Sequence, residues 1–164
     1  MKYLRILSVL AAAVFLTGCL PVIGSFPQAK ITSVLIDKSD RRMYLLSYGI
    51  PVKQYVIDLG SNPVGPKRQR GDGKTPEGDY HITHVNTRSA YTLSLGLNYP
   101  NAQDIQISKA MGVDPGDDIF IHGLPTGYGG APPDWTNGCV AVTNDEIREI
   151  VSIVKPGTPV KIKP

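Results

Sequence analysis

The segment of residues 118–143 constrains the fold most, because it places two short apolar runs on either side of a long loop. The first run, residues 119–121, is typical of a buried strand and ends on His122. The second run, residues 140–142, has β-type residues and begins at Cys139. The intervening loop is rich in residues that interrupt regular structure: Gly123, Pro125, Gly127, Gly129, Gly130, Pro132, Pro133 and Gly138. Long loops between strands are uncommon unless they have a function, so we expect a β fold with a site at these strand ends.

His122 and Cys139 together suggest a thiolate nucleophile with an imidazole base. A neighbouring imidazolium lowers the pKa of a thiol and makes the thiolate available. Gly138 lets the backbone approach a substrate closely, and the N–H groups of Gly138, Cys139 and Asn137 are candidates for binding an oxyanion. The alternative is structural, with Cys139 as a small buried residue and His122 as a satisfied strand-end residue. The combination of His-Gly, Gly-Cys and an enclosed loop favours catalysis.

Residues 1–18 are typical of a lipoprotein signal peptide. Two basic residues precede an apolar run at residues 6–16, which is too short for a comfortable membrane span. The run ends in a tetrapeptide that resembles the lipobox of bacterial lipoproteins, Leu16-Thr17-Gly18-Cys19. Cys19 is therefore the predicted lipidation site, and residues 19–30 form a short lipidated tether. The alternative is an ordinary signal peptide cut elsewhere, with Cys19 incidental.

The lipoprotein interpretation predicts a periplasmic protein of a Gram-negative bacterium. Leu20 replaces the aspartate that usually retains lipoproteins in the inner membrane, so anchoring in the inner leaflet of the outer membrane is expected. Removal of Lys2 and Arg5 lowers the net charge from +3 to +1, which excludes an electrostatic footprint for nucleic acid. Cys139 is then left as a free thiol without a disulfide partner, and such a thiol in a secreted protein is a candidate for reactivity.

Residues 31–164 are expected to form one mostly-β, sandwich-like catalytic domain with one clear C-terminal helix. Thr143 and Glu146 form a capping box, followed by apolar residues at i, i+3, i+4 and i+7, which predicts an amphipathic helix that stops at Lys155. A weaker pattern allows a helix at residues 102–111. Strands are expected at residues 31–37, 43–47, 52–59, 79–86, 91–95, 119–122, 140–142 and 158–163.

The loop at residues 60–78 superficially resembles a phosphate-binding loop. The Walker pattern requires glycine where this chain has Arg68, and the loop leads into a strand, so nucleotide binding is rejected. Its cations form either a solvated surface or a rim that attracts substrate carboxylates: Lys67, Arg68, Arg70 and Lys74. His81 and His84 lie on opposite faces of a strand, so they make no metal pair, and neither a metal nor another cofactor is predicted.

Three motifs resemble the L,D-transpeptidase (YkuD) catalytic domain family. His122-Gly123, the Gly/Pro loop and residues 136–140 (Thr-Asn-Gly-Cys-Val) are similar to the family's active-site motif. Residues 73–80 (Gly-Lys-Thr-Pro-Glu-Gly-Asp-Tyr) are similar to its upstream Thr-Pro-x-Gly-aromatic segment. Residues 95–101 (Leu-Gly-Leu-Asn-Tyr-Pro-Asn) resemble the Gram-negative branch, and the likeness covers roughly residues 31–163.

The resemblance implies cysteine acyl transfer on peptidoglycan stem peptides. Cys139 matches the nucleophile, which would attack the carbonyl at the L-centre of meso-diaminopimelate in a tetrapeptide, with D-alanine leaving. His122 matches the base, and Gly123 matches the position whose backbone carbonyl orients the imidazole. Thr136 matches the Ser/Thr of the motif. The acceptor would be an amine or water, and a murein-bound lipoprotein is a further implied partner.

One position departs from the family pattern. Most transpeptidases of the family carry arginine two residues after the cysteine, where this chain has Ala141. Two alternatives therefore stay open: a hydrolase that cleaves the murein–lipoprotein link or the stem peptide, and a non-catalytic murein-binding lipoprotein. Trp135 is predicted to line the substrate groove or to gate the site with residues 124–136, or alternatively to anchor the end of the loop.

Overall fold

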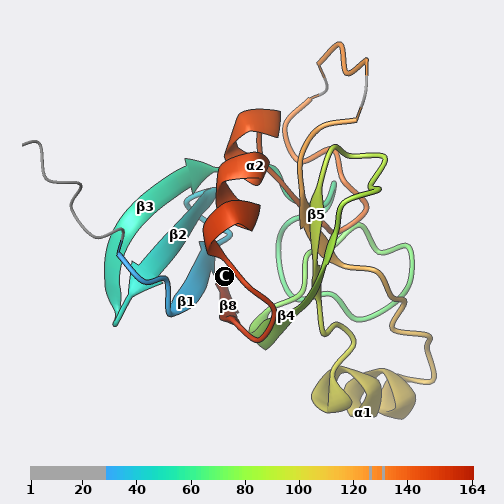
Figure 1. The fold of residues 1–164 in the computed structure, drawn as a ribbon. Coiled ribbons are helices and arrows are strands. Elements are labelled where there is room, and N and C mark those ends of the chain that lie inside the picture. Colours follow the sequence, from blue (N-terminus) through green and yellow to red (C-terminus); the bar gives the residue numbers. More distant parts are fainter. Residues whose placement is uncertain (1–28, 126, 131) are drawn as a thin grey trace, which may run out of the picture.

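A computed structural model of the chain describes residues 29–125, 127–130 and 132–164 (Figure 1). Within these residues lie eight strands and two helices, so the predicted mostly-β fold is confirmed. The strands are β1 (Ser33–Asp37), β2 (Arg42–Ser47), β3 (Ile50–Val56), β4 (Gly78–Asn86), β5 (Ser94–Leu97), β6 (Phe120–His122), β7 (Val140–Ala141) and β8 (Pro159–Lys163). The helices are α1 (Ala102–Met111) and α2 (Asn144–Ile153). The predicted signal peptide and most of the tether, Cys19 included, lie outside the described residues.

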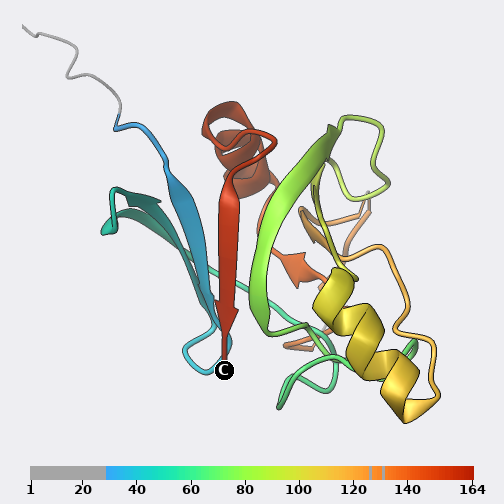
Figure 2. The same cartoon turned by 90° about the horizontal axis from the view of Figure 1, so that it is seen from below.

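The strands form one sheet in the order β3-β2-β1-β8-β4-β5-β6-β7. β1 is parallel to β8 and β6 is parallel to β7, while the other neighbours are antiparallel. Two isolated bridges pair Asp58 with Ala141 and Gly60 with Thr136, so the chain after β3 returns to the far end of the sheet. The sheet is therefore curled, and Figure 2 shows β1–β3 and β4–β5 diverging on either side of β8 with α2 at one end.

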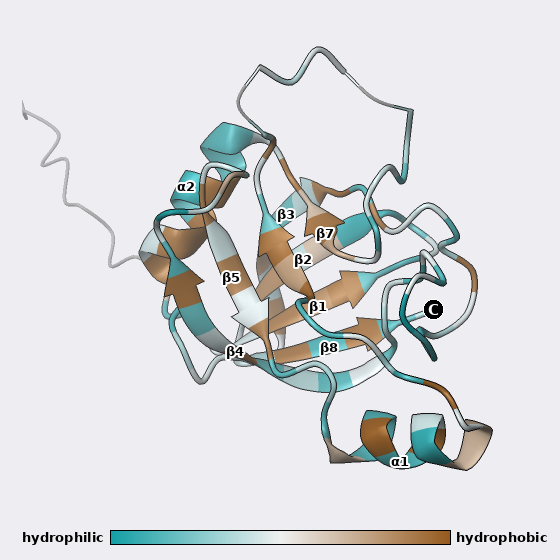
Figure 3. Ribbon diagram, turned by 90° about the vertical axis from the view of Figure 1, so that its right-hand side faces the viewer, coloured by the Kyte–Doolittle hydropathy of each residue, from teal (hydrophilic) through white to brown (hydrophobic). Residues whose placement is uncertain are grey.

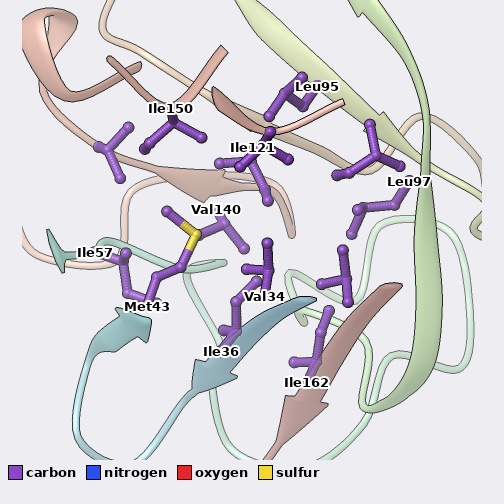
Figure 4. Packing of buried hydrophobic residues seen from close by; sticks show 14 of the residues in the cluster. Val34, Ile36, Met43, Ile57, Leu95, Leu97, Ile121, Val140, Ile150 and Ile162 are labelled. Atoms are coloured by element: carbon purple, nitrogen blue, oxygen red, sulfur yellow. The ribbon is translucent and has the colours of Figure 1, made fainter. Parts of the chain in front are cut away.

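The hydrophobic core fills the inside of the curl (Figure 4). Side chains on a strand point alternately to its two faces, and the inward residues of β1, β2 and β8 are all apolar. These buried residues are Val34, Ile36, Met43, Leu45, Val160 and Ile162. They meet Leu95, Ile121, Val140 and Ile150 from the other half of the fold. Among the described residues the buried cluster runs from Val34 to Ile162, so the two halves of the sheet share one hydrophobic core.

Helix α2 begins and packs as its sequence pattern predicts. Thr143 Oγ1 accepts from the N–H of Glu146, and the Glu146 carboxylate accepts from the N–H of Thr143 at 2.8 Å. Ile147 and Ile150 are buried against the sheet. The cap fixes the residue at which α2 begins. It therefore also fixes the C-terminal end of the segment that carries Cys139.

Helix α1 covers residues 102–111, where the sequence showed only a weak helical pattern, so the fold has two helices instead of one clear helix. Asn101 and Asp104 form its capping box, and the Asp104 carboxylate also accepts from the buried Tyr80 hydroxyl at 3.2 Å. Ile105 and Met111 stay exposed, so caps rather than apolar packing hold this helix. Figure 3 shows its mixed hydropathy beside the apolar inner strands. No helix in the described ranges is long and apolar enough to cross a membrane.

Some strand boundaries differ from those predicted. β3 covers residues 50–56 instead of 52–59, because Asp58 pairs separately with Ala141. β5 covers residues 94–97 instead of 91–95, because Thr92 has a positive φ of 67° and Leu93 N–H bonds back to Tyr91. In both places the chain leaves regular strand pairing, and Tyr91 and Ser94 line the cavity described below.

Candidate active site

Cys139 and His122 lie at the ends of two neighbouring strands. β6 ends on His122, and Cys139 immediately precedes β7, which runs parallel to β6 with Ile121 opposite Val140. Both side chains line one cavity of about 590 Å³. Its other lining residues include Tyr91, Ser94, Asp118, Trp135, Thr136 and Asn137. The structure therefore brings the predicted nucleophile, base and motif residues together at one site.

The imidazole of His122 is buried and has one defined tautomer. Its Nδ1 lies 2.6 Å from the carbonyl oxygen of Gly123, and a carbonyl only accepts, so Nδ1 carries the proton. Nε2 is left as the acceptor. Burial lowers the pKa of His122, and the hydrogen bond to Gly123 opposes this effect. The ring is therefore neutral at rest and suited to accept a proton.

Gly123 has to be glycine because the backbone there is packed against α2. A Cβ at this position would lie 2.6 Å from Asn144 Oδ1 and 2.8 Å from Ile147 Cγ2. Asn144 Oδ1 also accepts from the N–H of Leu124 at 2.7 Å. The first turn of α2 thus sets the path of the chain after β6 and aims the Gly123 carbonyl at the imidazole.

Two aromatic rings lie beside the imidazole. The ring centroid of Tyr91 is 4.5 Å from that of His122, with 39° between the planes, and the centroid of Trp135 is 5.8 Å away at 68°. The Trp135 indole N–H donates to Asp58 Oδ2 at 3.2 Å. Tyr91 and Trp135 thus exclude water from part of the imidazole, and Trp135 has the contacts of an anchor as well as of a cavity wall.

Asp134 anchors the end of the loop that leads to Cys139 through hydrogen bonds and an ion pair. Its backbone has a positive φ of 58°, an uncommon conformation for a residue with a side chain. The carboxylate accepts from the N–H of Leu59 at 3.0 Å and from two guanidinium nitrogens of Arg41 at 2.7 to 3.1 Å. Its own N–H donates to Asp58 at 3.3 Å. These contacts hold Trp135 at a fixed place beside His122.

The thiol of Cys139 is partly buried and neutral at rest. It lies 3.5 Å from the carbonyl oxygen of Asp118, to which it donates, and accepts from the N–H of Phe120 at 3.4 Å. Burial raises the pKa of Cys139, and the Phe120 N–H opposes this. The thiol and the imidazole are thus both neutral at rest and line the same cavity, and no hydrogen bond joins them in the described structure.

Thr136 closes a tight turn that holds Cys139. Its hydroxyl donates to the Cys139 carbonyl at 2.8 Å and accepts from the Gly138 N–H at 3.1 Å. The Gly138 N–H is therefore bonded inside the turn, and its role as an oxyanion donor stays a prediction that would require this bond to open. The N–H groups of Asn137 and Cys139 have no acceptor within the described part of the chain, so the oxyanion role stays a prediction for these two.

Gly138 permits a close approach to the backbone at Lys74, a contact that the sequence did not reveal. It has a φ of 126°, and a Cβ there would lie 2.5 Å from the carbonyl oxygen of Lys74. Gly60 is packed in the same way, since a Cβ on it would lie 2.1 Å from the Gly73 carbonyl oxygen and 2.9 Å from Gly138 Cα. The hydroxyl of Thr75, which is fully buried, accepts from the Gly60 N–H at 3.0 Å. The Gly-Lys-Thr segment is therefore a support beneath the turn of Cys139.

Two of the four cations predicted as a carboxylate-binding rim are already paired with carboxylates. Lys67 donates to Asp72 at 3.0 Å, and Arg70 contacts Asp114 at 2.8 Å and Asp117 at 3.1 Å. Lys74 donates to a backbone carbonyl. Lys67 and Arg70 are therefore weaker candidates for binding substrate carboxylates, because carboxylates of the protein already pair with their charges.

Ala141 brings no charge to the site. It is buried and pairs with Asp58, and within the described residues no lysine or arginine lines the cavity. His81 and His84 lie outside this cavity. In the part of the chain that the structure describes, no group of three His, Cys, Asp or Glu side chains is placed to hold a metal ion.

Four functional neighbours were not found by sequence reasoning: Tyr91, Asp58, Asp134 and Gly60. Tyr91, Asp58 and Gly60 reach the site across a long stretch of chain, and none of them belongs to a motif with recognisable spacing. Asp134 lies next to Trp135 in the loop before Cys139, and that position was its only signal in the sequence.

Comparison with known proteins identifies a family. The model of the L,D-transpeptidase catalytic domain (YkuD) matches residues 31–162. A protein of Escherichia coli named "Putative L,D-transpeptidase YafK" is 33% identical over 102 residues, which cover 61% of this chain and 36% of that protein. This chain thus spans about a third of the length of that curated relative.

Solved structures agree with this result. The helical cell shape determining protein Pgp2 of Campylobacter jejuni has a TM-score of 0.65 and 28% identity, covering 81% of this chain and 47% of that chain. Bd1075 of Bdellovibrio bacteriovorus has a TM-score of 0.59 and 27% identity, covering 82% of this chain and 48% of that chain. The chain belongs to the L,D-transpeptidase (YkuD) catalytic domain family.

Proposed function

We propose that this protein is a cysteine acyltransferase that acts on peptidoglycan stem tetrapeptides through a thioester on Cys139. The observation that carries the proposal is a neutral thiol and a neutral imidazole at the ends of adjacent parallel strands, lining one cavity, with Nε2 of His122 as the proton acceptor. Family membership supplies the peptidoglycan connection.

In the first half-reaction, Cys139 Sγ attacks the carbonyl at the L-centre of meso-diaminopimelate as its proton passes to His122 Nε2. The oxyanion of the tetrahedral intermediate is bound by the N–H groups of Asn137 and Cys139. The C–N bond to D-alanine then breaks, and the imidazolium gives its proton to the leaving amine. The product is a thioester, and D-alanine leaves.

In the second half-reaction, an amine or water attacks the thioester, and His122 accepts its proton. The C–S bond breaks, and the thiolate recovers the proton from the imidazolium. An amine acceptor gives transpeptidation, and water gives hydrolysis.

One observation favours the hydrolytic outcome as a second candidate. Ala141 stands where most of the family has arginine, and within the described residues the cavity lining contains no cation to hold an acceptor carboxylate. Water needs no such group. The hydrolase would cleave the stem peptide or the link between murein and its bound lipoprotein.

A non-catalytic murein-binding lipoprotein remains the third candidate, supported by Ala141 alone. The fixed tautomer of His122 and the acceptor atom it leaves free favour an enzyme, since binding alone requires neither. Cys139→Ala distinguishes the two, because a binding protein keeps its role in cells with alanine there and an enzyme loses it.

The proposed location is the periplasm, with the protein anchored by lipid on Cys19 to the inner leaflet of the outer membrane. Support comes from the sequence of residues 1–20. Labelling cells with a palmitate analogue tests this: label on the parent chain and its loss in Cys19→Ser are expected. Label that persists in Cys19→Ser contradicts lipidation at that residue.

The proposed activity is tested by incubating the reduced protein with disaccharide tetrapeptide or a carbapenem. We expect an adduct on Cys139 by mass spectrometry, and none in Cys139→Ser. Digestion of purified sacculi, with and without bound lipoprotein, followed by muropeptide analysis identifies the bond and the acceptor. A folded, reduced sample that forms no adduct and changes no muropeptide contradicts the proposal.

A further inference from the structure

An exposed apolar surface lies at the turn between β2 and β3, far along β3 from the active site. It consists of Tyr48, Ile50 and Val52, which are 77%, 67% and 40% exposed, and we call it the hairpin patch. Three of the eight large exposed apolar side chains in the described residues gather within five positions here. Exposed apolar side chains that gather in this way are a candidate interaction surface.

The hairpin patch lies where the chain enters the fold. The N–H of Tyr48 donates to Thr32 Oγ1 at 2.8 Å, and the N–H of Thr32 donates to the carbonyl of Leu46 at 2.8 Å. The entering strand β1 and the β2–β3 turn are both at the left of Figure 1. Cys19 lies ten residues before Ala29, so a lipid there is at most about 35 Å from the entry point.

Cations occur at the same edge. A groove of about 650 Å³ beside the entry point is lined by Lys30 and Lys155, among other residues. Within the described residues the side chain of Lys155 donates to the backbone carbonyls of Val151 and Ser152, and no carboxylate there pairs with its charge. An apolar tip with a tyrosine and neighbouring lysines fits the boundary between lipid headgroups and acyl chains.

The same edge is poorly suited to pairing with a second copy of the chain. β3 is the outer strand of the sheet, but Pro51 has no N–H to donate. The pairing of β2 with β3 is irregular between Leu45 and Leu46, and Lys53 places a charge on the strand. Proline, bulges and lysine are the features that keep edge strands from pairing.

We propose that the hairpin patch docks on a phospholipid surface and sets the orientation of the domain. From Ile50 to Asp58 the chain extends roughly 26 Å, at about 3.3 Å per residue. The cavity of Cys139 therefore lies at most about that far from the docked turn. This inference rests on the proposed lipid anchor at Cys19 and is independent of the chemistry at Cys139.

The test uses the chain from Cys19 onward with Cys139→Ser, coupled through the Cys19 thiol to a maleimide phospholipid. The vesicles contain phosphatidylethanolamine and phosphatidylglycerol, and the comparison is the same protein blocked with N-ethylmaleimide in solution. Coupling reproduces the tether whether or not cells acylate Cys19. We expect amide hydrogen exchange in residues 47–53 to slow roughly tenfold or more on the vesicles, because the tether raises the local lipid concentration, with no change in α1.

A triple variant, Tyr48→Ser with Ile50→Ser and Val52→Ser, is expected to lose this slowing. The matched control replaces three exposed apolar residues elsewhere, Val64→Ser with Ile105→Ser and Met111→Ser, and is expected to keep it. Unchanged Trp135 emission and melting temperature verify folding. Unslowed exchange in the parent, or slowing retained by the triple variant, overturns the proposal. Slowing that appears in solution as protein concentration rises would assign the patch to a second copy and also overturn it.

Discussion

Two loops border Cys139, and their stabilising hydrogen bonds are placed differently. The first, residues 60–77, is cross-linked from within by Asp72. Its carboxylate accepts from four donors: the N–H groups of Arg68, Gln69 and Lys74, and Nζ of Lys67. The second, residues 123–137, is held near its ends, where Leu124 N–H donates to Asn144 and Asp134 accepts from Arg41. We call the first loop the support, because its own residues cross-link it. We call the second loop the span, because the contacts named here hold it near its ends.

Glycine has a different function in each loop. In the support and the turn it touches, a Cβ on Gly60 or Gly138 would overlap backbone atoms. In the span, a Cβ on Gly127, Gly129 or Gly130 would meet no atom within 4 Å in the described structure. The first glycines allow close packing, and the second leave open space. Substitutions of these glycines in the span should therefore disturb the position of the thiol less than substitutions in the support.

The largest effect is expected from Gly60→Ala. The new Cβ would lie 2.1 Å from the Gly73 carbonyl oxygen, so the backbone has to move. We expect a loss of about 3 kcal/mol or more in the free energy of unfolding, measured by urea denaturation. Gly129→Ala is the matched change in the span and should alter stability by less than about 0.5 kcal/mol. Equal effects of the two substitutions would contradict the distinction between the loops.

Asp72→Asn should weaken the support by about 2 kcal/mol, because it leaves the buried Lys67 without a charged partner. Burial by itself raises the pKa of Asp72, but its four hydrogen bonds hold that pKa below the ordinary value of 3.8. The stability from this carboxylate is therefore present above about pH 4 and is lost as the pH falls below it. Urea denaturation between pH 3 and 6 should show a smaller pH dependence in Asp72→Asn. An unchanged pH dependence of the unfolding free energy in Asp72→Asn would contradict a stabilising role for the Asp72 carboxylate.

The thiol of Cys139 should be protonated at neutral pH, so its reactivity should follow its small thiolate fraction. Its raised pKa predicts that the rate of alkylation by iodoacetamide rises about tenfold per pH unit from pH 7 to 9, without a plateau near neutrality. His122→Gln should change this rate little, because the lowered pKa of His122 leaves the ring uncharged at rest. A plateau between pH 6 and 8 that disappears in His122→Gln would instead indicate a resting thiolate–imidazolium pair.

The smallest effect is expected from Trp135→Phe, at the junction of span and support. The variant loses the hydrogen bond to Asp58 and should lose about 1 kcal/mol of stability. If residues 124–136 also gate the site, its ratio of hydrolysis to transfer shifts toward hydrolysis, and acylation of Cys139 changes Trp135 fluorescence in the parent. An unchanged ratio with unchanged emission would leave Trp135 as an anchor only.

Local patterns predicted much of the fold. The capping box at Thr143 and Glu146 located α2, and a run of strand-type residues before a turn located the strand that buries Val34 and Ile36. The His-Gly and Gly-Cys pairs identified residues that the structure brings to one cavity. What escaped prediction depends on contacts between distant residues, since nothing near Gly60 in sequence reveals the carbonyl of Gly73 against it. Likewise, Asp72 and Asp58 resemble any loop aspartate until the donors around them are known.

The orientation of His122 by the Gly123 carbonyl determines which mutations can disturb the imidazole. In a triad oriented by a side chain, one codon change removes the group that holds the base. Here the orienting oxygen belongs to the main chain, and no substitution deletes it. Mutations that tilt the imidazole have to act on what positions the peptide, such as Asn144 and Ile147 in the first turn of α2. A mutational scan of activity should therefore find α2, remote in sequence from the histidine, among its sensitive segments.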